Sequence, residues 1–348
     1  MKKFFALILA VVVNCIFGAT LATAAGAAPV LGAVALNAVG CIHMLPAGSL
    51  LSGVYTEVWT GQIIEKLRED EKGTFLDGIE DFSAFAENDV VHLVAEGADP
   101  DVLINNTEYP IPGQNLNDTD VPISLDKFQT KKTPVTDDEL YAISYDKMAS
   151  VKRRHGKSIT NQKLAKAIYN IAPNSHTAST PIVETSGEVD NGRQRITRAD
   201  IIKLKQYFDD MNVPEEGRRL VLCSDHVNDL LLLDQAFKDQ YHNYKTGKIS
   251  DMYSFEIYER NAMPVYSTDG TKKSFGAIAG PGEFRASVAF STSRVWKATG
   301  GTKMYYREAA TDPDYQQNLI NFRHYFKAAR FKNEAVGAIM SKAVTSQN

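Results

Sequence analysis

Nucleophile, acid and base side chains stand next to one another at Ser224, Asp225 and His226. Such a set relays a proton only if the base lies within hydrogen-bond reach of the nucleophile. Adjacent residues at the start of a helix point in different directions, which prevents this contact. Capping explains the first two residues, because a hydroxyl accepts a backbone N–H there and a carboxylate complements the positive end of the helix dipole. We therefore predict a helix start, with Ser224 as its cap, and no catalytic site.

Other kinds of chemistry have no supporting pattern in the sequence. The seven histidines include no HExxH motif and no pair four residues apart, so they indicate no metal site. The glycines at 280–282 and 300–301 lack the strand, spacing and helix of a dinucleotide-binding loop. The cysteines are far apart without CxxC spacing, and Cys223 fits a small buried apolar residue. We expect no enzyme, no cofactor and no metal.

Length and composition are those of an ordinary globular protein. The 348 residues are 44% hydrophobic and 23% charged, with a formal net charge of −4. This balance argues against disorder and permits a large core. A domain that grips nucleic acid through one basic face typically has a pI above about 9. The composition therefore gives no sign of such a face, although a wall that merely encloses DNA does not need one.

The elements that would position any site are clearest between Val213 and Leu233. Pro214 fixes its own φ and Gly217 permits a tight reversal, which predicts a turn. The apolar run Leu220–Cys223 that follows is typical of a strand covered on both faces. A helix that begins at Ser224 completes the block, with no spare residues between the three elements.

This block and its flanking segments resemble the central domain of the major capsid proteins of tailed bacteriophages, the Hong Kong 97-type fold. In that family a helix, here 199–211, leads into a VPxxGR turn, a hydrophobic strand and a capped helix, and a segment like 247–258 follows. The order of elements matches from about Val54 to the C-terminus. The resemblance implies an α+β fold with axial and peripheral domains, an extended loop and an N-terminal arm. It divides the chain into an apolar N-terminal segment (1–53), the arm (54–89), the extended loop (90–135), the peripheral domain with its spine helix (136–195), the axial domain (196–285) and C-terminal strands that complete both domains (286–348).

The apolar N-terminal segment departs from the family. Lys2 and Lys3 precede an apolar run at 4–13, and small residues follow at 22–24, as in a secretory signal peptide. Apolar residues continue well beyond this site, which is unusual for a mature N-terminus. Three interpretations stay open: an export or membrane signal, an apolar extension packed in an assembly, or a natural start at a later methionine such as Met44.

The arm and the loop are predicted from weaker patterns. A helix over 56–68 has an apolar face beside Trp59, which we interpret as an anchor against a neighbouring surface. Strands at Val90–Val94 and Val121–Leu125 bracket a connection that is too long for an ordinary hairpin. In capsid proteins the similar loop lies over a neighbouring subunit. A surface loop without such a role is the alternative.

The spine helix is predicted from a capping box and a helical periodicity. Thr136 and Glu139 can satisfy each other's backbone amides, so a helix should start at Asp137. Gly156 can end its first segment, and a second segment should reach Ile171, which implies a break or kink. The basic cluster at 152–157 either faces a packaged genome or is a solvated helix end.

For the C-terminal half, the sequence predicts short strands and one further capped helix. Thr197 and Asp200 form a second capping box. Strands are expected at 255–258, 263–266, 286–290, 303–307 and 321–328, and a short helix at 334–339.

We predict a structural capsid protein that assembles as many copies, in pentamers and hexamers, into an icosahedral phage or prophage head around double-stranded DNA. Scaffold, portal or decoration proteins are further partners in such a head. The protein would assemble in the bacterial cytoplasm and reside in the virion. The alternatives are an encapsulin-like shell that loads an enzyme, and an exported or membrane-tethered envelope protein. The expected subunit-interface residues are Trp59, Asn105, Tyr109, Lys131, Lys132, Arg153 and Arg154, and the expected turn and cap residues are Thr136, Glu139, Pro214, Gly217 and Ser224.

Overall fold

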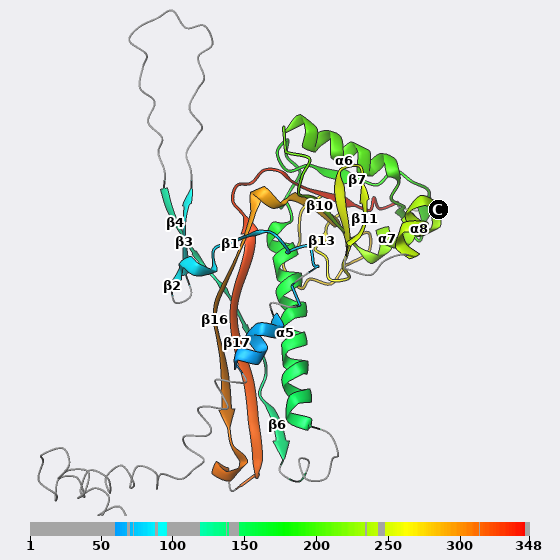
Figure 1. Ribbon diagram of the computed structural model, residues 1–348. Coiled ribbons are helices and arrows are strands. Elements are labelled where there is room, and N and C mark those ends of the chain that lie inside the picture. The colour runs from blue at the N-terminus through cyan, green and yellow to red at the C-terminus, as the bar shows by residue number, and fades with distance from the viewer. Residues whose placement is uncertain are drawn as a thin grey trace, which may run out of the picture. The chain divides into compact units, whose positions relative to one another are not determined.

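The computed structural model describes residues 60–67, 70–71, 73–87, 90–95, 119–136, 138, 146–233, 235–242, 248–312 and 314–344. The chain divides into two units, Met1–Gly61 and Gln62–Asn348, and the elements below belong to the second unit (Figure 1). The predictions for segment 1–53, Trp59, Asn105, Tyr109 and Glu139 lie outside the described residues.

A six-stranded mixed sheet forms the centre of the unit. Its strand order is β11 (Lys248–Met252), β12 (Phe255–Glu259), β10 (Arg218–Leu222), β15 (Ser287–Ser291), β18 (Val336–Met340) and β7 (Ile182–Glu184). Successive side chains of a strand point to opposite faces, and both faces of this sheet are covered. Leu220 and Leu222 of β10 belong to a core shared with α6 (Arg198–Asp210), α7 (Ser224–Leu233) and α8 (Gln235–His242). Val221 between them joins a second core, with Ile168 of helix α5.

The turn before β10 is confirmed. Gly217 has φ +76°, and a Cβ at this position would lie 2.2 Å from Thr292 Oγ1, so both backbone conformation and space require glycine. Helix α7 then begins at Ser224 itself, and Val227 N donates to Cys223 O at 3.0 Å. Ser224 is thus the first helical residue, so the cap position belongs to Cys223 and not, as predicted, to Ser224, whose hydroxyl donates to the side chain of Asn261.

Helix α6 confirms the capping box at Thr197. The Asp200 carboxylate accepts from Thr197 N at 2.8 Å, and Ile201, Leu204 and Phe208 are buried. The helix predicted at 334–339 is wrong. Residues 336–339 belong to strand β18, which is buried at every residue and paired with β15 on one side and β7 on the other. A short apolar run fits a buried strand as well as a helix, and pairing with distant strands decides.

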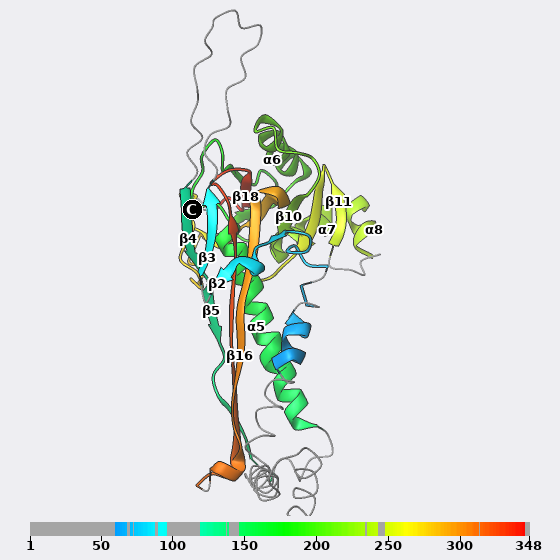
Figure 2. The same cartoon turned by 60° about the vertical axis from the view of Figure 1, so that its left-hand side comes forward.

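A long hairpin and a long helix make up the second layer (Figures 1 and 2). Strands β16 (Val295–Arg307) and β17 (Gln317–Arg330) are antiparallel, and α5 (Lys147–Ile171) packs along β17. Three shorter strands complete this sheet: β1 (Glu80–Asp81), β5 (Asp126–Gln129) and β6 (Thr133–Thr136).

Helix α5 is continuous, so the predicted break at Gly156 is wrong. Glycine weakens a helix interior by only about 1 kcal/mol, and packing of the buried face, including Leu164 and Ile168, overrides this cost. The N-cap is Asp146, whose carboxylate accepts from Ala149 N at 2.9 Å. Thr136 ends strand β6, and its expected capping partner lies outside the described residues.

The strands predicted on either side of the long connection are confirmed. β3 (Val90–Ala95) and β4 (Thr119–Ser124) are antiparallel from Val90↔Ser124 to Ala95↔Thr119, and β2 (Ala86–Glu87) adds to β3. The connection itself is outside the described residues. Val91 packs with Trp296 of β16, which seats the base of this hairpin on the long hairpin.

Candidate functional site

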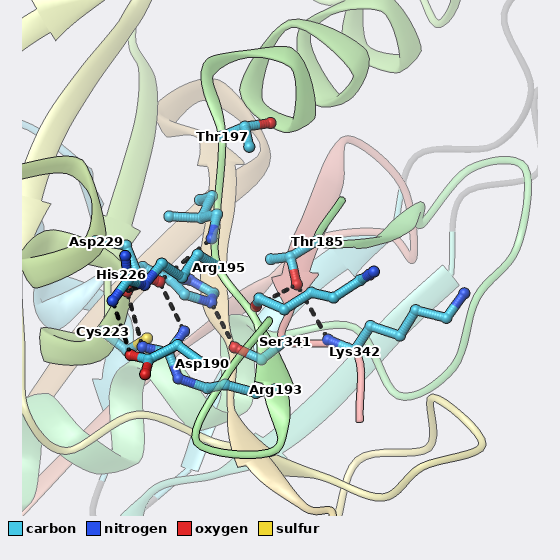
Figure 3. A network of polar contacts seen from close by, with 12 residues as sticks. Thr185, Asp190, Arg193, Arg195, Thr197, Cys223, His226, Asp229, Ser341 and Lys342 are labelled. Atoms are coloured by element: carbon cyan, nitrogen blue, oxygen red, sulfur yellow. Dashed lines mark hydrogen bonds and ion pairs between the residues drawn. The ribbon is translucent and has the colours of Figure 1, made fainter. Parts of the chain in front are cut away.

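The Ser224–Asp225–His226 set does not converge. His226 is fully buried, with Nε2 3.0 Å from Ser341 Oγ (Figure 3) and Nδ1 2.6 Å from Ser287 Oγ. Ser224 instead donates to Asn261. Burial lowers the pKa of His226 to about 4, so the imidazole is neutral at pH 7. Ser287 is also fully buried and accepts from Cys223 N at 3.0 Å. No substrate can reach this buried histidine. It joins α7 to Ser287 of β15 and to Ser341, which directly follows β18.

A second buried cluster beside it was not foreseen from the sequence. Asp229 of α7 accepts from Arg193 Nη1 at 2.6 Å and Nη2 at 2.9 Å, and from Ile196 N at 3.2 Å. Arg193 belongs to the small hairpin of β8 (Val189–Asp190) and β9 (Arg193–Gln194). The cluster therefore fixes this hairpin and the entry of α6 onto α7 (Figure 3). The Asn191-Gly192 turn, with φ +48° and +76°, was the available hairpin signal.

A third cluster fastens the segment 70–77 to the rest of the unit. Lys163 of α5 is 1% exposed and pairs with Glu71, which also accepts from Lys297 Nζ at 3.2 Å. Burial lowers the pKa of Lys163, and the Glu71 carboxylate opposes that effect. Arg219 of β10 donates to Phe75 O at 3.0 Å. One short segment is thus tied to α5, the long hairpin and the central sheet.

The predicted basic residues lie on the surface of the second layer. Lys131, Lys132, Arg153 and Arg154 are all exposed, and the cluster at 152–157 lies inside α5, which continues to Ile171. The interpretation of this cluster as a helix end is therefore wrong. Lys131 and Arg154 are brought together, since both line a groove of about 770 Å³ between α5 and β5.

Metal and membrane features are absent from the part of the chain that the structure describes. No group of three or more His, Cys, Asp or Glu residues there has the arrangement of a metal site. No helix among the same residues combines the length and apolarity of a membrane span. Cys223 is buried, and burial raises the pKa of its thiol to about 11, in line with the predicted inert role.

No family model matches the sequence, and no curated protein matches it either. Solved structures do match. The capsid of cyanophage P-SCSP1u has a TM-score of 0.54 at 14% identity and covers 77% of this chain and 88% of that chain. The chain has a phage capsid fold. The capsid of a native GTA particle has a TM-score of 0.55 at 9% identity, and the match covers 77% of this chain and 89% of that chain. A virus-like particle from Pyrococcus furiosus has a TM-score of 0.50 at 11% identity, and the match covers 82% of this chain and 99% of that chain.

The match confirms for the fold the resemblance that the Val213–Leu233 block indicated. The matched folds combine helices and sheets as this chain does, and the alignments extend over most of each capsid chain. Because the identities are below 15% in these matches, they establish the architecture and not the role of single residues.

Proposed function

We propose that this chain is the major capsid protein of a tailed bacteriophage or prophage, with a Hong Kong 97-like fold. The likeness of about three quarters of the chain to phage capsid structures carries the proposal. In this assignment α5 is the spine of the peripheral domain (136–195), strands β10, β11 and β12 of the central sheet belong to the axial domain (196–285), and the C-terminal strands complete both. The segment 54–89 is the arm and 90–135 the extended loop.

The work of such a subunit is assembly in many copies, as pentamers and hexamers. Exposed apolar side chains support this role, because they stand on separate elements: Phe85 is 62% exposed, Leu232 71%, Ile278 89% and Tyr315 71%. A two-fold dimer would need one self-complementary patch, whereas a shell needs several different contacts. Modest contacts of this kind add up when the shell closes. Trp59, Asn105, Tyr109, Lys131, Lys132, Arg153 and Arg154 remain our proposed interface residues.

The cationic face of α5 supports double-stranded DNA as the enclosed partner. The helix carries Lys and Arg residues and no Asp or Glu, and Arg153 and Lys157 on it are exposed. Attraction of phosphates to such a face is independent of sequence and weakens with salt. The proposed location is the virion, with assembly in the host cytoplasm.

Electron microscopy of the expressed full-length protein tests the proposal. Closed particles of uniform diameter that protect DNA from nuclease are the expected result. A monodisperse monomer under assembly-promoting conditions would refute it. Particles that hold an enzyme and no DNA would instead identify an encapsulin-like shell, the alternative stated from the sequence. Mass analysis of the native N-terminus tests the export alternative.

A further inference from the structure

The groove between α5 and β5 has an unusual border. Six consecutive residues, Asp126 to Lys131, line it on the strand side. Because successive side chains of a strand point to opposite faces, a groove that touches every residue follows the edge of the strand. Among the described strands β5 pairs only with β17, so its other edge is open to a further strand.

The groove is also cationic. Lys127, Lys131, Arg154 and Lys166 line it, against the single carboxylate of Asp126, which accepts from Asn170 Nδ2 at 3.1 Å. In the described part of the chain, no carboxylate lies within ion-pair distance of Lys127, Lys131 or Arg154. Lys166 Nζ lies over the Phe275 ring, 4.7 Å from its centroid. Three cations therefore face an open strand edge without counter-charges.

The walls of the groove are partly apolar. Phe128 and Phe275 contribute rings, and Val151 and Ile159 of α5 contribute aliphatic side chains. Phosphates of a nucleic acid duplex need neither an apolar wall nor a strand edge. An extended peptide uses all three features: its backbone pairs with the edge, its acidic side chains meet the cations, and an apolar side chain packs against the rings.

We propose that the groove binds an extended acidic segment of a different protein, which adds as a strand to the free edge of β5. Charge complementarity with Lys127, Lys131 and Arg154 selects the acidic sequence, and strand pairing supplies the backbone contacts. The segment 96–118 of a second copy is the competing occupant, because it carries five acidic residues and no Lys or Arg. Pro100, Pro110 and Pro112 cannot donate to a strand ladder, so they confine its pairing to residues 101–109.

Fluorescence anisotropy with the full-length protein at low salt tests the proposal, whether or not particles form. The probe is a labelled dodecapeptide of alternating Glu and Val. We expect saturable binding that Arg154→Gln weakens about threefold and Lys127→Glu with Lys131→Glu about tenfold or more, given about 0.2–1 kcal/mol for an exposed ion pair. Arg153→Gln is the matched control, because Arg153 is the neighbouring exposed residue on α5 outside the groove, and it should leave the affinity within about twofold.

Three further probes separate strand addition from plain charge attraction. A peptide with Lys in place of Glu should not bind, and one with N-methylated alternate amides should lose most of its affinity, because methylation blocks the ladder. Equal binding of the methylated peptide overturns the proposal, as does equal loss in Arg153→Gln and Arg154→Gln. Preferential binding of a DNA duplex, or of a peptide of residues 96–118, with the same dependence on Arg154 would assign the groove to DNA or to a second copy and also overturns it.

Discussion

Replacing Glu71 with Gln tests whether charge holds the segment 70–77 on α5. Glu71 is the partner of both Lys163, which is 1% exposed, and Lys297. Removing one partner of a buried ion pair costs about 3–5 kcal/mol, because the remaining charge is left uncompensated. Glu71 is itself 14% exposed, and the Gln amide oxygen still accepts a hydrogen bond. We therefore expect a loss at the lower end, about 3 kcal/mol in the free energy of unfolding.

The assay is urea unfolding followed by the fluorescence of Trp296, in a Trp59→Phe background because the chain has two tryptophans. Trp296 is fully buried and precedes Lys297 in β16. Lys66→Gln is the matched control, since it removes the partly exposed Lys66–Asp70 pair of the same region and should cost less than about 1 kcal/mol. Lys163→Met should cost less than Glu71→Gln, because Glu71 keeps Lys297 and the thioether packs on Phe326. Equal effects of Glu71→Gln and Lys66→Gln would refute the reasoning.

Three further changes have expected outcomes in the same unfolding assay. Gly217→Ala should lower the free energy of unfolding by more than about 1 kcal/mol, because alanine disfavours the positive φ and its Cβ clashes with Thr292. Adding Thr292→Ala should restore only the part of the stability that the clash removes. Complete recovery of stability would contradict the argument from φ. Gly156→Ala should raise the free energy of unfolding by up to about 1 kcal/mol, because α5 is continuous there and nothing lies within 4 Å of the added Cβ. A less stable variant would contradict the packing described for α5. His226 has its pKa lowered to about 4 in the folded state against 6.5 unfolded, so its stabilising effect is present above pH 6.5 and is lost as the pH falls towards 4. The stability difference between wild type and His226→Gln should shrink by about 2 kcal/mol between pH 7.5 and pH 5, and a constant difference would contradict neutral burial.

Elements with strong local signals were predictable from the sequence. The turn with Pro214 and Gly217, the strand after it and the capping box of α6 depend on interactions within a few residues, and the structure has all three. The strands β3 and β4 were also predictable from β-branched residues and alternation. The order of these elements along the chain carried the resemblance to tailed-phage capsid proteins, and that resemblance implied the fold.

Features that depend on distant partners were not predictable. β18 is a strand because it pairs with β15 and β7. The sequence of residues 334–339 alone does not indicate these distant pairing partners. Glu71 and Lys163 are 92 positions apart, and Arg193 and Asp229 are 36 apart, so no periodicity links them. The continuity of α5 through Gly156 likewise comes from tertiary packing, which outweighs a local weakness of about 1 kcal/mol.

The net charge of this chain is a poor guide to the charge of its individual faces. A value of −4 for the whole chain suggested no basic face, yet α5 has cations and no anions, and Arg153 and Lys157, which lie outside the groove, are exposed on it. The acidic residues lie elsewhere in the chain, so they offset these cations only in the net charge of the whole chain. A single subunit with so few free cations would hold DNA weakly at physiological salt. In the proposed shell, repetition of the same face would multiply a weak contact without a strongly basic chain. We therefore expect that DNA retention by such particles falls steeply with salt while the shell itself persists.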